Sequence, residues 1–136
     1  MPYTVKDWMT SPVTVIDPDS SVSHALTLMR RHNIHSLVVD LSVEGRLAYG
    51  IITTTDIRDK ILAAGHNPSE MCVRDIMTAP VKTARPEWSL RRCAQEMQKY
   101  GIHHFPVVDA DGVLAGIISA TDLFMAAEEI GWGGVD

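Results

Sequence analysis

The chain repeats itself, and this duplication restricts its possible folds more than any other sequence feature. Residues 5–13, VKDWMTSPV, return 68 positions later as residues 73–81, VRDIMTAPV. The same offset continues through the next predicted helix and strand, and then falls to 66, which pairs Asp56 with Asp122. A match sustained at a fixed spacing predicts two copies of one supersecondary unit.

The change of offset places two additional residues in the first repeat, in the predicted turn at residues 41–46. Surface turns accept such insertions because they disturb no packing. The sequence predicts four segments, which are a first repeat at 1–65, a linker at 66–70, a second repeat at 71–130 and a frayed C-terminal tail at 131–136.

Each repeat contains one strongly amphipathic segment. In residues 21–31, the apolar side chains follow helical spacing and share one face: Val22, Ala25, Leu26 and Met29. Asp19 or Ser20 is the predicted N-cap of this helix, and Ser89 is the predicted N-cap of its counterpart. Asn33 and Gly101 follow the two helices and are typical of a left-handed helix end.

Two strands are predicted after each of these helices. In the first repeat they cover residues 36–39 and 47–52, and in the second they cover 105–108 and 113–118. A short extended segment precedes each helix, and a second helix follows each strand pair, over residues 55–64 and 121–130. The fold class is therefore α/β (α+β) with two β-α-β-β-α repeats. Since each small sheet has one face without helices, we expect the repeats to pack sheet to sheet about a pseudo-two-fold axis.

The second helix of each repeat begins at a distinctive turn, GIITTTD at residues 50–56 and GIISATD at residues 116–122. The isoleucines are typical of a strand end. The hydroxyl and carboxylate side chains are typical of a helix N-terminus. Both sequences therefore predict a strand-to-helix turn that presents backbone amides, hydroxyls and one carboxylate, Asp56 or Asp122.

Composition disfavours several classes of function. The formal charge is −5 and no Lys/Arg cluster offsets it, so nucleic-acid binding is not expected. No apolar run approaches 18 residues and no signal-peptide pattern opens the sequence, so no membrane partner and a cytoplasmic location are expected. Cys72 and Cys93 occupy unrelated positions, which favours reduced thiols over a disulfide.

Catalytic and metal-binding patterns are weak. The sequence has no nucleophile elbow, phosphate-binding loop or HExxH motif, and Asp56 and Asp122 belong to separate turns, so no enzyme is expected. His103 and His104 are adjacent in an extended segment, where neighbouring side chains point to opposite faces. No Cys or acidic side chain completes a ligand set with them or with His32 and His35, so no metal site is predicted.

The order DxMTxPV, amphipathic helix, IHHFPVVD and GIISxTD resembles the cystathionine β-synthase (CBS) domain. Two such sets resemble a tandem CBS pair, or Bateman module, over about residues 5–130. The first repeat departs from the pattern at Val38, where the second has Pro106. The resemblance implies a stand-alone regulatory module that binds an adenosine-containing ligand such as AMP, ADP, ATP or S-adenosylmethionine, requires no other cofactor, and forms a homodimer.

The resemblance also implies that each ligand site combines the turn of one repeat with early strand segments of the other. One expected set is Ser119, Thr121, Asp122, Thr14, Ile16, His35 and Leu37. The other is Thr53, Thr55, Asp56, Thr83, His103, His104 and Phe105. The carboxylates would accept hydrogen bonds from ribose hydroxyls, and the helix N-termini would face phosphate. Arg58, Arg74 and Lys82 are candidate counter-charges for phosphate.

Two alternatives stay open. The Thr-Asp pairs also suit plain helix caps, so the chain could be a ligand-free interaction or scaffold protein with vestigial clefts that contacts an unidentified regulated protein. Apolar positions of the second helices are candidates for a dimer surface: Ile57, Ile61, Leu123 and Met125.

Overall fold

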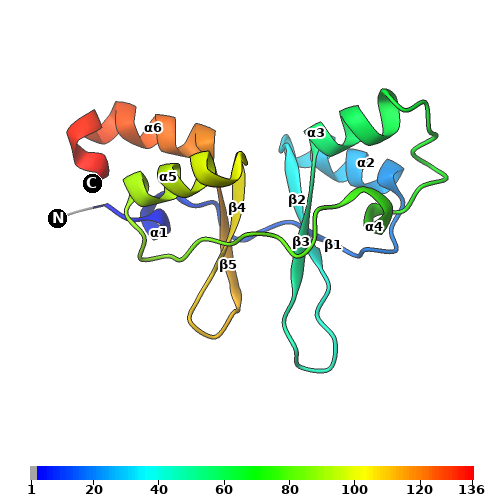
Figure 1. Cartoon of the computed structure of the whole chain (residues 1–136), viewed down its shortest axis with the longest axis horizontal. Coiled ribbons are helices and arrows are strands. Elements are labelled where there is room, and N and C mark those ends of the chain that lie inside the picture. Colours follow the sequence, from blue (N-terminus) through cyan, green and yellow to red (C-terminus); the bar gives the residue numbers. More distant parts are fainter. Residues whose placement is uncertain (1–2) are drawn as a thin grey trace. The chain divides into compact units, whose positions relative to one another are not determined.

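The computed structural model describes residues 3–136 and divides them into two compact units (Figure 1). The Asp56 unit comprises Thr14–Val81. The Asp122 unit comprises the described residues up to Val13 together with Lys82–Asp136. The compact units therefore differ from the sequence repeats, because the segment that opens each repeat folds with the other repeat.

The Asp56 unit is built on a three-stranded sheet in the order β1-β2-β3. β1 pairs parallel with β2, and β2 pairs antiparallel with β3. The strands and helices, in chain order, are β1 (Val15–Ile16), α2 (Val22–His32), β2 (Ser36–Asp40), β3 (Tyr49–Thr53), α3 (Thr54–Ile57), the π-helix η1 (Arg58–Leu62) and α4 (Val73–Ile76).

The Asp122 unit repeats this plan around the antiparallel pair of β4 and β5. An isolated parallel bridge between Ala84 and Val107 stands where β1 pairs with β2 in the other unit. The helices and strands, in chain order, are α1 (Val5–Trp8), α5 (Leu90–Tyr100), β4 (His104–Val108), β5 (Leu114–Ser119), α6 (Ala120–Ile130) and the 3-10 helix η2 (Trp132–Val135). These elements confirm the predicted mixed fold class and strand order.

The first amphipathic helix of each unit has matching ends. Ser21 caps α2 by accepting from the His24 N–H, and Ser89 caps α5 by accepting from the Arg92 N–H, both at 3.0 Å. The prediction of Asp19 or Ser20 as the first cap was therefore one or two residues too early. Asn33 (φ 52°) and Gly101 (φ 63°) adopt the predicted left-handed conformation that ends each helix.

Two other predictions of local structure were wrong. The helix after Asp56 is not one α-helix, because α3 spans four residues and continues as the π-helix η1, which ends before Gly65. The C-terminal residues do not form a frayed tail, because Trp132–Val135 form a 3-10 helix. Neither feature has a hydrophobic repeat in sequence that would reveal it.

Each unit has its own hydrophobic core between helices and sheet. The core of the Asp56 unit includes Ile57 and Ile61, and that of the Asp122 unit includes Leu123. These three side chains were expected at a dimer surface, and their burial corrects that expectation; only Met125 is exposed. Within residues 3–136, no helix combines the length and the hydropathy needed to cross a membrane.

Candidate functional site

The turn at Asp56 connects β3 directly to α3. The Asp56 Oδ2 atom accepts from the Thr53 backbone N–H at 2.9 Å and from the Thr53 hydroxyl at 3.1 Å. In return, the Thr53 hydroxyl oxygen accepts from the Asp56 N–H at 3.2 Å. This reciprocal capping box fixes the carboxylate at the end of the strand.

The turn at Asp122 has the same geometry between β5 and α6. The Asp122 Oδ2 atom accepts from the Ser119 N–H at 2.8 Å, and the Ser119 Oγ atom accepts from the Asp122 N–H at 3.2 Å. Both carboxylates thus use Oδ2 for the cap, and both residues are only partly buried. Because a carboxylate has two oxygens, the cap leaves further acceptor capacity at each turn.

Both turns are fastened to the residue that precedes the neighbouring strand. The Thr54 N–H donates to the His35 carbonyl at 3.0 Å, and the Ala120 N–H donates to the His103 carbonyl at 2.9 Å. The side chains of both histidines are exposed. Each unit therefore holds the backbone of an exposed histidine against its own turn.

The glycine that opens each turn permits a close backbone approach. Ile51 exchanges two hydrogen bonds with Thr78, and Ile117 exchanges two with Thr10, at 2.8–3.0 Å. A Cβ atom at Gly116 would lie 2.9 Å from the Thr10 carbonyl oxygen. The glycine thus allows the segment that contains Thr10 or Thr78, and that opens the other repeat, to pair with the strand beside the turn.

A capping box alone does not identify a ligand site in this chain. Asp7 accepts from the Thr4 N–H at 2.8 Å, and Asp75 accepts from the Cys72 N–H at 2.9 Å, with the same three-residue spacing. These two caps begin α1 and α4, which follow no strand. Only the caps of Asp56 and Asp122 lie at a strand-to-helix turn beside an exposed histidine.

Lys60 distinguishes the two turns, and the sequence analysis missed it. Its Nζ atom lies 3.4 Å from Asp56 Oδ1 and donates to the Ile76 carbonyl at 2.8 Å. The i, i+4 spacing from Asp56 is the signal that could have revealed this contact. The corresponding residue in the other unit is Ala126, which is fully buried.

The structure groups the predicted site residues by repeat. The Asp56 unit contains part of each expected set: Thr14, Ile16, His35, Leu37, Thr53, Thr55 and Asp56. The Asp122 unit contains the remainder: Thr83, His103, His104, Phe105, Ser119, Thr121 and Asp122. Combination of residues from the two units in one site stays a prediction.

Three of these residues lie in the hydrophobic cores. Ile16 and Leu37 belong to the core of the Asp56 unit, and Phe105 belongs to that of the Asp122 unit. Phe105 packs edge-to-face against Trp88, with ring centroids 6.0 Å apart. Their side chains therefore support the strands beside the turns and are closed to solvent.

The candidate phosphate counter-charges already have partners. Arg58 pairs with Asp59 and Arg74 with Asp19, both at 2.7 Å, and hydrogen bonds to these carboxylates raise the pKa of each guanidinium. The Lys82 ammonium lies 4.7 Å from the centroid of the Tyr100 ring. A phosphate at any of these cations would compete with an existing interaction.

Other polar chemistry is limited in the described part of the chain. Residues 3–136 contain no cluster of three or more His, Cys, Asp or Glu side chains able to hold a metal ion. Burial, with a smaller contribution from Asp122, raises the pKa of the Cys93 thiol to about 12. Cys93 is therefore a neutral core side chain at physiological pH.

Comparison with known proteins identifies both repeats. The CBS domain family model matches residues 5–63 and 73–129. The chain is 31% identical over 120 residues to the CBS domain-containing protein YhcV of Bacillus subtilis, covering 88% of this chain and 82% of that protein.

Two similar solved structures contain adenosine compounds. The CBS domain pair of protein MJ0100, in complex with 5-methylthioadenosine and S-adenosyl-L-methionine, is 30% identical with a TM-score of 0.83, covering 96% of this chain and 99% of that one. CBSX2 in complex with AMP is 28% identical with a TM-score of 0.74, covering 94% and 98%.

Proposed function

The chain belongs to the CBS domain family, whose tandem pairs are regulatory, and from this premise we propose that it is a sensor of an adenosine-containing ligand. The candidate ligands are AMP, ADP, ATP and S-adenosylmethionine. The observation that carries the proposal is the repeated strand-to-helix turn, in which a fixed carboxylate uses only Oδ2 for its cap.

The chemistry of the turn suits a ribose. A ribose offers two neighbouring hydroxyl groups as donors, and a carboxylate accepts both without a proton transfer. Because the cap already holds the carboxylate in place, binding would cost little side-chain entropy. Asp122 has no counterpart of Lys60 nearby, so its turn is the better candidate for an uncharged diol.

The positions of His35 and His103 bear on which strand contributes to each proposed ligand site. Backbone hydrogen bonds of 3.0 Å and 2.9 Å tie His35 to the Asp56 turn and His103 to the Asp122 turn. This proximity supports sites in which turn and histidine come from the same unit. In the arrangement implied by the family resemblance, His35 would instead serve Asp122 and His103 would serve Asp56.

Calorimetric titration with AMP, ATP and S-adenosylmethionine tests the proposal. We expect saturable binding of at least one compound, and about 10- to 100-fold weaker binding at one site in Asp122→Asn or Asp56→Asn. Asparagine keeps an oxygen for the cap but replaces the second acceptor with a donor, so it separates ligand binding from capping.

The chain supplies its own matched controls. Asp7→Asn and Asp75→Asn alter capping boxes of the same geometry at α1 and α4, and they should leave the titrations unchanged. His35→Ala and His103→Ala then assign the sites. Loss of the same binding event in His103→Ala and Asp122→Asn supports sites within one unit, and loss in His35→Ala and Asp122→Asn supports the other arrangement.

A ligand-free scaffold is the alternative function, since the same turns would then act only as caps. Absence of heat with all three compounds, from folded protein freed of bound ligand, would favour it. In that case the four Asp→Asn variants should differ only in stability.

The proposal also includes non-catalytic signalling by a cytoplasmic homodimer. A ligand shifts a conformational equilibrium only by the difference between its affinities for the two states. The dimer is therefore expected to change its dissociation constant or shape on ligand binding, which sedimentation and small-angle scattering measure with and without the compound identified by calorimetry.

A further inference from the structure

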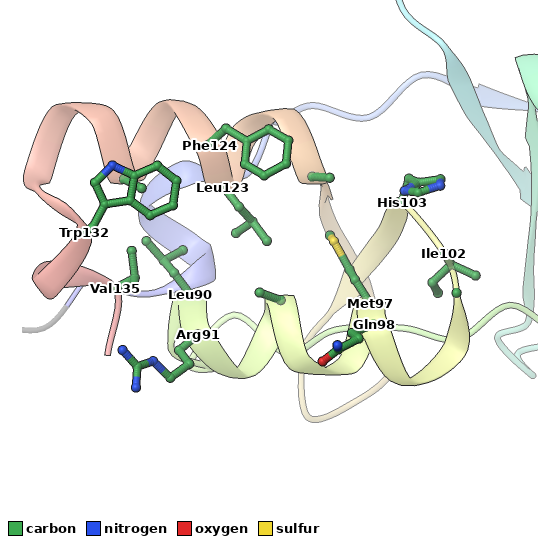
Figure 2. Close-up of a pocket in the computed structure, with 14 residues that line it drawn as sticks. Leu90, Arg91, Met97, Gln98, Ile102, His103, Leu123, Phe124, Trp132 and Val135 are labelled. Carbon is green, nitrogen blue, oxygen red and sulfur yellow. The ribbon is translucent and has the colours of Figure 1, made fainter.

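An apolar cavity of about 490 Å³ lies between α5 and α6 of the Asp122 unit (Figure 2). Its walls are Leu90 and Met97 from α5 and Leu123 and Phe124 from α6. The Asp122 carboxylate does not line the α5–α6 groove, but Ala120 of the same turn and His103, to which that turn is bonded, do. Sequence analysis did not anticipate this groove.

The last six residues close one end of this groove. We name residues 131–136 the strap. Trp132 and Val135 point into the groove, as Figure 2 shows, and the Asp136 carboxylate forms an ion pair with Arg91 of α5. The strap turns back because Gly131 adopts a φ of +88°, a conformation that favours glycine.

The strap is held loosely. The side chains of Arg91 and Asp136 are 54% and 60% exposed, and ion pairs between such exposed groups contribute little to stability. Trp132 remains 63% exposed although it lines the groove. Three of the six residues are glycines, which lose the most conformational entropy when ordered.

The helix surface beside the groove is unusually apolar. Phe124 and Met125 of α6 are 59% and 60% exposed. We call these two residues and Trp132, which lines the groove together with Phe124, the apolar face. The corresponding positions in the Asp56 unit are Arg58 and Asp59, which form a charged pair. Exposed apolar side chains gathered at a groove are typical of an association site.

The charges around the face suit a second copy of the same chain. α5 carries Arg91 and Arg92, whereas the end of α6 carries Glu128 and Glu129. A two-fold contact places the same patch on both copies, so α5 of one can lie against α6 of the other. Arg91 would then face the partner's glutamates, but the strap already pairs it with Asp136.

We propose that the strap competes with a second copy of the chain for the α5–α6 groove and for Arg91. When the strap is seated, it fills one end of the groove and neutralises the arginine. When it leaves, both become available to the partner. This inference rests on the dimer of the proposed function and deepens it.

Sedimentation of the full-length double variant Trp132→Ser, Asp136→Lys tests the competition. The serine removes one of the two apolar side chains that the strap places in the groove, and the lysine repels Arg91, so the strap should leave the groove more often. We expect the dimer dissociation constant to fall at least tenfold relative to the wild type. An unchanged or larger dissociation constant would overturn the proposal.

A charge exchange identifies the contact in the same background. Glu128→Arg should weaken the released dimer at least tenfold, and adding Arg91→Glu should restore most of the loss. Failure of the second substitution to restore association would exclude this pairing of helices. Val43→Ser, at an exposed apolar residue of the β2–β3 turn, is the control and should change nothing.

The outcomes separate the strap from the dimer itself. If neither the wild type nor the released variant associates at the highest concentration reached, both the proposed dimer and the strap's role fail. If both associate equally, the dimer stands and the strap's role fails. Ligand titrations of the same samples measure ligand binding separately from association.

Discussion

The Asp56 and Asp122 units contain the same turn in different surroundings. Both fix a carboxylate through a capping box and fasten the turn to a histidine carbonyl. Around Asp56 are Lys60 and a charged helix surface, whereas around Asp122 the corresponding residues are Ala126, Phe124 and Met125. Duplication thus preserved the geometry of the turn while the outer helix changed from a charged surface to an apolar one.

This difference suits the two units, which share one fold, to different kinds of contact. The Asp56 turn has a cation beside its carboxylate, so it is suited to a ligand that brings its own negative charge. The Asp122 turn has Ala126 in place of Lys60, and its helix exposes the apolar side chains of Phe124 and Met125. The following predictions use one unit as the control for the other.

The largest expected difference concerns the glycines that open the turns. In Gly116→Ala, the new Cβ atom would lie 2.6 Å from the Met9 sulfur and 2.9 Å from the Thr10 carbonyl oxygen. In Gly50→Ala, the nearest atom is the Thr78 carbonyl oxygen at 3.0 Å. We expect losses of unfolding free energy of about 3 kcal/mol and about 1 kcal/mol respectively, measured by urea denaturation. Equal losses would mean that the backbone pairings of Ile51 with Thr78 and of Ile117 with Thr10 accommodate a Cβ atom equally well.

The second prediction tests the exchanged segments. Val5 and Val73 occupy the same repeat position, and both are fully buried, but Val5 lies in the core of the Asp122 unit and Val73 in that of the Asp56 unit. Each Val→Ala substitution should cost about 2 kcal/mol, between the losses typical of Ile→Val and Leu→Ala.

Hydrogen exchange shows which unit each valine stabilises. Val5→Ala should speed amide exchange mainly in α5, β4 and β5, and Val73→Ala should speed it mainly in α2, β2 and β3. Faster amide exchange within the repeat that contains the mutated valine would contradict our finding that each opening segment folds with the other repeat.

The sequence could not predict that the opening segment of each repeat folds with the other repeat, and the reason is physical. The segments containing Val5 and Val73 are nearly identical, so either one satisfies the strand beside either glycine. Local patterns did predict the left-handed residues Asn33 and Gly101, because helix ends depend on neighbours in the chain.

Part of the candidate site was predictable because helix caps, like helix ends, depend on residues that are close in the sequence. The caps of Asp56 and Asp122 are local and were found, and Lys60 was within reach of the i, i+4 rule. Burial of Leu123 and exposure of Phe124 depend on which helix face meets the core. Adjacent apolar residues do not specify that face, so the predicted dimer surface was wrong in three of its four residues.

The third prediction is an expected equality. Ser21 and Ser89 cap α2 and α5 with the same bond length of 3.0 Å. Replacing either by alanine should cost about 1 kcal/mol, measured by thermal and urea unfolding. Because these helices retain the same geometry in both units, a difference well above the experimental error would show that the units diverge beyond their outer helices.

The smallest expected effect concerns Cys93, whose counterpart in the other unit is Ala25. Burial raises the pKa of this thiol to about 12, whereas its ordinary value is 9.0. The neutral thiol is therefore favoured in the folded state, and its contribution is complete below pH 9. As the pH rises from 9 towards 12, the unfolded chain releases the proton first and stability falls. Between pH 7 and pH 9 this loss amounts to only about 0.4 kcal/mol.

Cys93→Ala gives the Asp122 unit the residue of the Asp56 unit and should remove this pH dependence. Urea titrations of both proteins at pH 7, 9 and 10 provide the measurement, and the wild type should lose stability relative to the variant as the pH rises. A constant difference would mean that the thiolate is tolerated in the folded core, and that the two cores differ only in volume at this position.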